Sequence, residues 1–113
     1  MVEFKLSSRR RIDVAGLDGQ GRFLFVEVKS SPEDFRADGK WHEYPAFCDW
    51  FYFAVPPGFP HDILPEDAGL IVADGHDGAV LRSADETPMN GNRRRTQTLA
   101  FARAAADRLA RGG

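Results

Sequence analysis

The stretch FLFVEVKSS, residues 23–31, decides how this chain can fold. Its aromatic and β-branched residues predict a buried strand. Glu27 and Lys29 stand inside this run, although charged side chains are among those least often buried. Side chains alternate along a strand, so one face carries Phe23, Phe25, Glu27 and Lys29, and the other carries Leu24, Val26 and Val28. A core strand with two opposite charges on one face needs a physical explanation.

Strands and helices alternate on both sides of this stretch. Apolar alternation and turn residues predict strands over 2–7, 11–17, 22–30, 50–55, 69–74 and 78–83. Helical pieces are predicted over 32–38 and 40–49, a short helical turn over 60–65 and a basic C-terminal helix over 92–111. The first of these helices has Ser31 as its cap and Pro32 at its first position. The last is expected to pack through a stripe of Leu99, Ala102, Ala106 and Leu109. This order predicts one α/β domain, residues 1–113, built on a mixed sheet.

The strands over 11–17 and 22–30 are apolar on both faces. We therefore expect helices to cover both faces of the sheet. Hydrophobic residues make up 42 % of the chain and charged residues 28 %, an ordinary globular balance. No apolar run is long enough to span a bilayer, and the N-terminus has no apolar signal region, so no membrane association is expected. The single cysteine, Cys48, fits a reducing, cytoplasmic setting.

Charge is distributed unevenly along the chain. Residues 1–12 carry a formal charge of +3, residues 13–90 carry −10 and residues 91–113 carry +5. Basic ends can contact nucleic acid although the chain is acidic overall. A solvated basic helix is the simpler interpretation of the C-terminal charge.

The loop between the second and third predicted strands sets the position of Asp13 relative to Glu27. A two-residue loop, Gly19-Gln20, would place these two side chains on opposite faces of the hairpin. A three-residue loop, 19–21, would place Asp13 directly across from Glu27. Glycines at both ends of that loop suit a turn with a bulge, so we predict the three-residue loop. Asp13, Glu27 and Lys29 then meet at one end of the hairpin.

Two carboxylates at this spacing need compensation. At about 5 Å they repel by roughly 3 kcal/mol at an effective dielectric of 20. A Mg²⁺ or Mn²⁺ ion held by Asp13 and Glu27 would remove this cost, because both ions favour hard oxygen ligands. Lys29 would then orient or deprotonate a water, or offset phosphate charge. The alternative is an ion pair between Glu27 and Lys29 near a strand end, with no catalytic role.

The residues Asp13, Glu27 and Lys29 match the D-(x)n-E-x-K pattern of the PD-(D/E)xK nuclease superfamily. The stretches RRRIDVAGLD, VEVKSSPEDFRADGKWHEYPAFCDWFYFAVPPGFP and LPEDAGLIVAD, with the Arg-rich last helix, resemble the MmcB family of bacterial DNA-repair proteins. This resemblance implies a restriction-endonuclease-like α/β core and a metal-dependent DNA endonuclease, with Asp13, Glu27 and Lys29 as catalytic residues. Such nucleases usually begin with a core helix, which is missing before the strand at 2–7. A non-catalytic DNA-binding repair module on the same fold is the main alternative.

DNA is the partner that this resemblance implies. Candidate contacts are the basic cluster Arg9, Arg10 and Arg11, a phosphate contact at Lys40, base stacking by Trp41 and a phosphate hydrogen bond from Tyr44. Core packing is the alternative for both Trp41 and Tyr44. A homodimer or other repair proteins are further candidate partners. A third class of function is a protein-interaction domain, in which the acidic middle of the chain contacts a basic partner.

Overall fold

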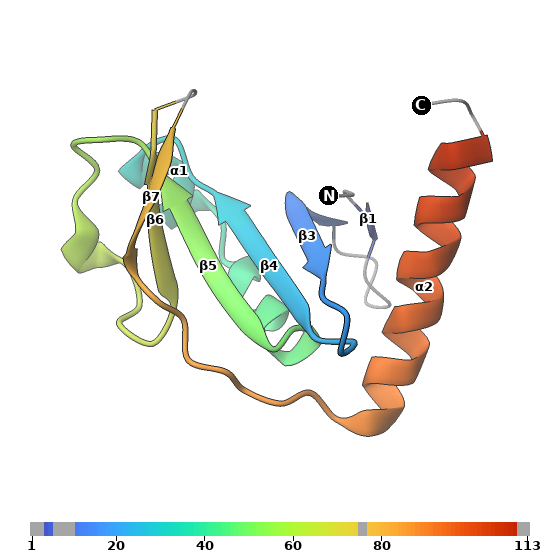
Figure 1. Ribbon diagram of the computed structural model, residues 1–113. Coiled ribbons are helices and arrows are strands. Elements are labelled where there is room, and N and C mark those ends of the chain that lie inside the picture. The colour runs from blue at the N-terminus through green and yellow to red at the C-terminus, as the bar shows by residue number, and fades with distance from the viewer. Residues whose placement is uncertain (1–3, 6–10, 75–76, 111–113) are drawn as a thin grey trace.

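A computed structural model describes residues 4–5, 11–74 and 77–110. Within this part of the chain, strands β3 (Val14–Leu17), β4 (Phe23–Val28), β5 (Trp50–Val55), β6 (Gly69–Ala73) and β7 (Gly78–Arg82) form one sheet in that order. The sheet is mixed, because β4, β5 and β6 are parallel while the outer strands β3 and β7 run antiparallel to their neighbours (Figure 1). This is the mixed α/β sheet with flanking helices that the sequence predicts.

The hairpin β3–β4 has the predicted register. Leu17 pairs with Phe23 and Val14 with Val26, which is the arrangement of the three-residue loop over 19–21. Gly21 has a φ of +79°, a backbone conformation that glycine adopts without steric cost. The expected single strand over 11–17 is divided at Asp13 into β2 (Arg11–Ile12) and β3. Strand β2 pairs instead with β1 (Phe4–Lys5), and the rest of the strand expected over 2–7 lies outside the described residues.

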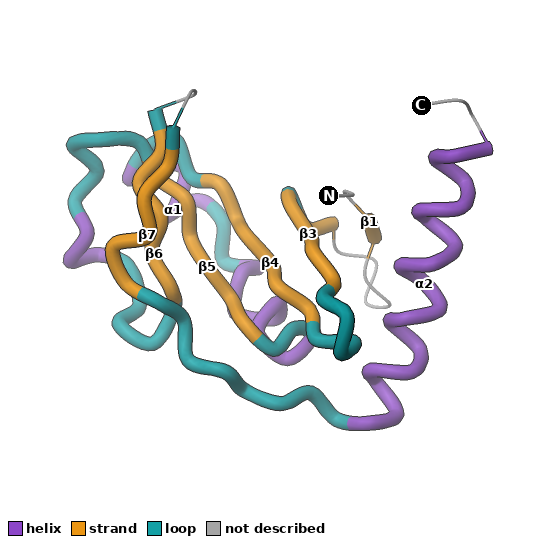
Figure 2. The backbone as a smooth tube through the Cα atoms, in the orientation of Figure 1, coloured by secondary structure: helices purple, strands orange, loops and turns teal. Residues whose placement is uncertain are grey.

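Two helical segments connect β4 to β5. Helix α1 (Pro32–Ala37) begins as predicted, with the Ser31 hydroxyl accepting a hydrogen bond from the Asp34 amide. The predicted second piece is a 3-10 helix, η1 (Lys40–Phe47), with Pro45 inside it. A second short 3-10 helix, η2 (His61–Ile63), follows β5. Because β4 and β5 are parallel, α1 and η1 return the chain across the sheet (Figure 2).

The core lies on one face of the sheet. Phe23, Phe25 and Phe53 are fully buried there, and aromatic residues of α1 and η1 pack on them. The prediction that both faces are covered holds only in part for the described residues, because on the other face Val26 is buried but its neighbours are more exposed. On the other face, Val28 is 50 % exposed and Trp50 and Tyr52 are only half-buried. This face therefore carries apolar side chains that the described residues leave partly exposed to solvent.

Helix α2 (Gly91–Ala110) matches the predicted C-terminal helix, but its packing differs from the prediction. Leu99 is 52 % exposed and Leu109 is 77 % exposed. The side chains that pack are Arg94, Gln97, Phe101 and Ala104, which follow one another at three- or four-residue spacing. The first two residues of this stripe are polar because they contact polar groups of the core. Gln97, for example, donates a hydrogen bond to the Phe47 carbonyl.

The buried carboxylate of Asp49 fixes the start of α2 to the sheet. It is 1 % exposed, accepts hydrogen bonds from the Phe23 and Met89 amides, and pairs with Arg94 at 2.6 Å. Arg94 also donates to the Gly21 carbonyl in the hairpin loop. One ion pair thus links the hairpin, the start of β5 and the last helix. Among the described residues, no helix combines the length and apolar character needed to cross a bilayer.

We predict that Arg94→Gln lowers the free energy of unfolding by about 3 kcal/mol, because Asp49 stays buried without its charged partner. The neighbouring Arg95→Gln removes the same charge from an exposed position and should change stability by no more than about 0.5 kcal/mol. Urea unfolding of the two variants measures the difference. Equal losses would show that this ion pair does not anchor the helix.

Candidate active site

Asp13 and Glu27 meet where β3 begins, beside the end of β4. The Asp13 amide donates to Glu27 Oε1 at 3.4 Å, and Asp13 Oδ2 accepts from the Val28 amide at 2.9 Å. In an uninterrupted strand, a backbone carbonyl would accept the hydrogen bond of the Val28 amide. Here the Asp13 carboxylate accepts it instead, which accounts for the break in the predicted strand. Glu27 is 4 % exposed, whereas Asp13 is exposed to solvent. The buried carboxyl group of Glu27 is thus held against the backbone of Asp13, whose own accessible carboxyl group lies close enough to raise the pKa of Glu27.

Lys29 extends the site beyond β4. Its backbone amide donates to the Ala54 carbonyl, which holds it beside β5. Its side chain is buried, with Nζ 3.7 Å from Glu27 Oε2 and 2.5 Å from Asp38 Oδ2. Asp38 ends helix α1 and also accepts a hydrogen bond from the Lys40 amide through Oδ1. The ammonium group therefore lies between two carboxyl groups from different elements.

Asp38 was not among the residues predicted for the site. No motif marks it, because a single Asp after a helix is a common residue in a common place. Its position still follows from the predicted elements. Helix α1 starts three residues after Lys29 and contains only six residues, about 9 Å of rise, so its end lies within reach of a lysine side chain.

The electrostatics of the site are unusual for a small core. Burial, followed by the hydrogen bond and charge of the adjacent Asp13 carboxyl, raises the pKa of Glu27 to about 8, although the Lys29 ammonium lowers it. Burial lowers the pKa of Lys29, but its hydrogen bond to Asp38 and the nearby carboxylates outweigh this effect and raise it overall. Burial also opposes the charge of Asp38, whose pKa is nevertheless lowered by Lys29. The raised pKa values favour a protonated Glu27 and a charged Lys29 at neutral pH.

The donor atoms suit a hard divalent cation. Asp13 and Glu27 offer carboxylate oxygens, and the exposure of Asp13 leaves room for water or phosphate. A cation would also remove the repulsion that helps keep Glu27 protonated. Within the described residues, no group of three or more His, Cys, Asp or Glu side chains is arranged to hold a metal. Asp13 and Glu27 together offer two such side chains, fewer than a group of this kind requires.

The residues predicted to contact DNA occupy different environments. Lys40 is exposed at the start of η1, beside Asp38. Trp41 is half-buried and packs against Phe35 and Phe53. Tyr44 is only 5 % exposed and packs near Phe51, so the core alternative describes it better than phosphate contact. Arg9 and Arg10 lie outside the described residues, and only the backbone of Arg11 is described.

The fold and the site define a mixed α/β protein with a carboxylate pair and a lysine at the end of a central strand. Residues 1–112 match the family model described as DNA repair protein MmcB-like. The chain belongs to this family, which supports a role in DNA repair. No curated protein sequence matches it.

The comparison with solved structures supports the fold. The SPO1766 protein of unknown function from Silicibacter pomeroyi is similar to this chain, with a TM-score of 0.88 and 39 % sequence identity. The match covers 96 % of this chain and 75 % of that one. The two proteins therefore have the same fold.

We predict that the metal-free protein loses stability as the pH rises from about 4.5 to about 8. The folded state keeps the proton of Glu27 up to about pH 8, whereas an unfolded chain releases it near pH 4.5. Because the folded state binds the extra proton, unfolding becomes easier as protons become scarce, and the loss levels off above pH 8. The shift corresponds to at most about 5 kcal/mol.

Glu27→Gln removes this titration. With chelator present, the free energy of unfolding of the variant relative to the parent should increase steadily between pH 5 and pH 8. Glu33→Gln, which changes an exposed carboxylate on α1, is the matched control and should follow the parent. A constant difference between Glu27→Gln and the parent across this range would contradict the raised pKa.

Proposed function

We propose that this chain is a metal-dependent DNA endonuclease acting in DNA repair. The observation that carries the proposal is the buried contact of Glu27 with Asp13, next to Lys29 and open to solvent through Asp13. A fold gains nothing in stability from burying a carboxyl group beside another one. Strongly perturbed carboxyl groups of this kind are concentrated at functional sites.

Asp13 and Glu27 would hold Mg²⁺ or Mn²⁺ in this reaction. When bound, such an ion acts as a Lewis acid toward the phosphate and lowers the pKa of coordinated water. The Lys29 ammonium, fixed by Asp38, would offset charge on the scissile phosphate or orient the attacking water. Asp38 would not contact the substrate, and its role is to hold Lys29 in place.

DNA would approach from the side where Asp13 and Lys40 are exposed. Lys40 lies next to the carboxyl group that binds Lys29, so a phosphate near Lys29 would also be near Lys40. Contacts of this kind depend on phosphate charge and read no sequence. The basic cluster Arg9, Arg10 and Arg11 remains a candidate for further backbone contact.

The second candidate is a DNA-binding repair module without catalysis. The specific observation in its favour is that Lys29 already satisfies Glu27 and Asp38 without any metal. The described residues also hold no group of three or more His, Cys, Asp or Glu side chains arranged to bind a metal, and the third carboxylate nearby, Asp38, pairs with Lys29. Metal dependence separates the two functions, because a binding module keeps its activity in chelator.

We predict that the parent protein cleaves linear, nicked, flapped or branched DNA with Mg²⁺ or Mn²⁺ and loses this activity in chelator. Lys29→Ala and Asp13→Asn should each lower the cleavage rate by at least about 100-fold, because each removes a group that acts on the phosphate or holds the metal. Glu33→Gln should keep the parental rate. A gel assay on the four DNA forms measures cleavage.

Melting curves distinguish loss of chemistry from loss of folding. Above about pH 8, where Glu27 is ionised, Asp13→Asn removes the repulsion between the two carboxylates, so its melting temperature without metal should there equal or slightly exceed that of the parent. It should also lose the stabilisation that Mg²⁺ or Mn²⁺ gives the parent. Suppose instead that Lys29→Ala and Asp13→Asn both melt at lower temperatures, and that the parent shows neither stabilisation by metal nor cleavage. These results would support the binding module.

A further inference from the structure

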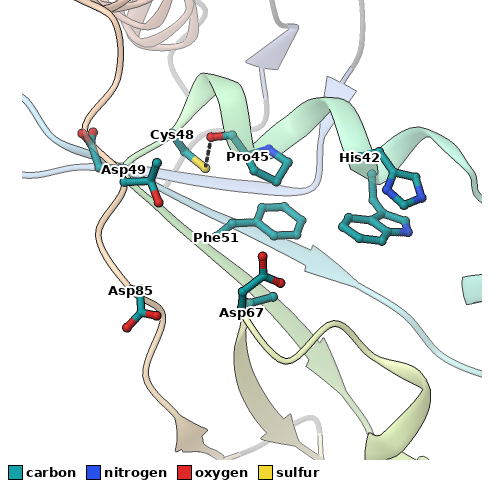
Figure 3. A pocket seen from close by; sticks show the side chains of 10 residues that line it. His42, Pro45, Cys48, Asp49, Phe51, Asp67 and Asp85 are labelled. Carbon is teal, nitrogen blue, oxygen red and sulfur yellow. Dashed lines mark hydrogen bonds between the residues drawn. The ribbon is translucent and has the colours of Figure 1, made fainter.

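A cavity of about 350 Å³ opens on the side of the core next to η1. Figure 3 shows His42 and Pro45 of η1 on one side of it, Phe51 in the middle, and Asp67 and Asp85 from two separate segments opposite η1. The size is in the range that holds one large side chain or a small ligand. Neither Glu27 nor Lys29 lines this cavity, so it is separate from the candidate active site.

Aromatic rings form part of the cavity wall. Trp41 and Phe51 both line it, and their rings lie 14° from parallel with centroids 6.4 Å apart. Phe51 is held edge-on against the buried Phe53, and Trp41 packs on the same Phe53 ring. The ring of His42, which also lines the cavity, lies on Trp41 with 3.8 Å between the ring centroids, so Trp41 and His42 form the wall together. Aromatic faces fixed in this way attract cations, and they bind a planar guanidinium group better than a compact ammonium group.

The rim of the cavity is negatively charged. Asp67 and Asp85 are exposed, and neither forms an ion pair or hydrogen bond with another described residue. Asp49 also reaches the cavity, but Arg94 already neutralises it. Among the described residues that line the cavity, none is Lys or Arg. A phosphate would therefore be repelled, whereas a cation would find two unpaired carboxylates.

Both acidic segments are held in position before any ligand arrives. Arg82 donates from Nε to the Ala68 carbonyl and from Nη2 to the Pro65 carbonyl, both at 2.9 Å, which fixes the loop of Asp67. The segment of Asp85 is tied down two residues later, where the Thr87 amide donates to the Asp49 carbonyl at 2.8 Å. Such preorganisation lowers the entropy that binding would otherwise cost.

We propose that this cavity binds an arginine side chain presented by a basic segment of a partner protein. The guanidinium would pair with Asp67 and Asp85 while its flat face rests on the wall of Trp41 and Phe51. The stem of the arginine would pack against Pro45. The chain would thus have an acidic protein-docking site on one part of its surface, independent of its contacts with DNA.

The test is a titration of the ¹⁵N-labelled protein with three short peptides that differ at one position: Arg, Lys or the uncharged isostere citrulline. The Arg peptide should give saturable shifts at Trp41, Asp67 and Asp85. The Lys peptide should bind at least about threefold more weakly because it cannot stack in a plane. The citrulline peptide should give no saturable shifts because it has no charge.

Variants show whether the acidic rim is responsible. The double variant Asp67→Asn with Asp85→Asn should weaken binding of the Arg peptide by about tenfold or more, the equivalent of losing one charged contact. Glu66→Gln, next to the cavity but not lining it, should change the affinity less than about twofold. Both positions are exposed, so the double variant should fold as the parent does, and its rate of DNA cleavage should stay at the parental level.

Three results would overturn the proposal. Equal binding of the citrulline peptide would remove the role of charge. Unchanged affinity in the double variant would place the peptide elsewhere. Shifts at Trp41, Asp67 and Asp85 on adding a short oligonucleotide, with none from the Arg peptide, would assign the cavity to nucleic acid.

Discussion

The contact between the carboxyl groups of Asp13 and Glu27 constrains the rest of the structure around it. For the two groups to meet, the strand has to break at Asp13, just before β3 begins, and the hairpin loop has to contain three residues. For Lys29 to offset them from within the core, helix α1 has to be short enough to return Asp38 to the end of β4. The position of the strand break, the length of the hairpin loop and the length of α1 thus together bring one cluster of ionisable groups into contact. Burial of this cluster opposes folding.

A second buried carboxylate shows what a structural role looks like in the same molecule. Asp49 accepts two backbone hydrogen bonds and pairs with Arg94, and although burial raises its pKa, these contacts lower it overall. Glu27 is buried to a similar extent, yet its pKa is raised to about 8. One carboxylate is stabilised by its surroundings, and the other is held in an environment that opposes its charge. This contrast is the physical reason for proposing a functional role for Glu27 and a structural role for Asp49.

The hairpin register was predictable because the two glycines of the loop specify its length, and the cap of α1 was predictable from Ser31 and Pro32. The meeting of Asp13 with Glu27 follows from that register. The break of the strand at Asp13 was not predictable from the periodicity of the strand. It arises because the Asp13 side chain replaces a backbone carbonyl as the acceptor for the Val28 amide. The packing stripe of α2 was missed because Arg94 and Gln97 face polar groups inside the core. Hydrophobic spacing favoured Leu99 and Leu109, which are exposed.

Binding of Mn²⁺ followed by electron paramagnetic resonance tests the central claim most directly, because it reports the ion held by the carboxylate pair whether or not a suitable DNA is known. The parent protein should bind one Mn²⁺ at this site, with affinity that rises as Glu27 loses its proton, and Asp13→Asn and Glu27→Gln should each remove that binding. Absence of bound Mn²⁺ at millimolar concentration and pH 8.5, or binding that both variants retain, would contradict the account.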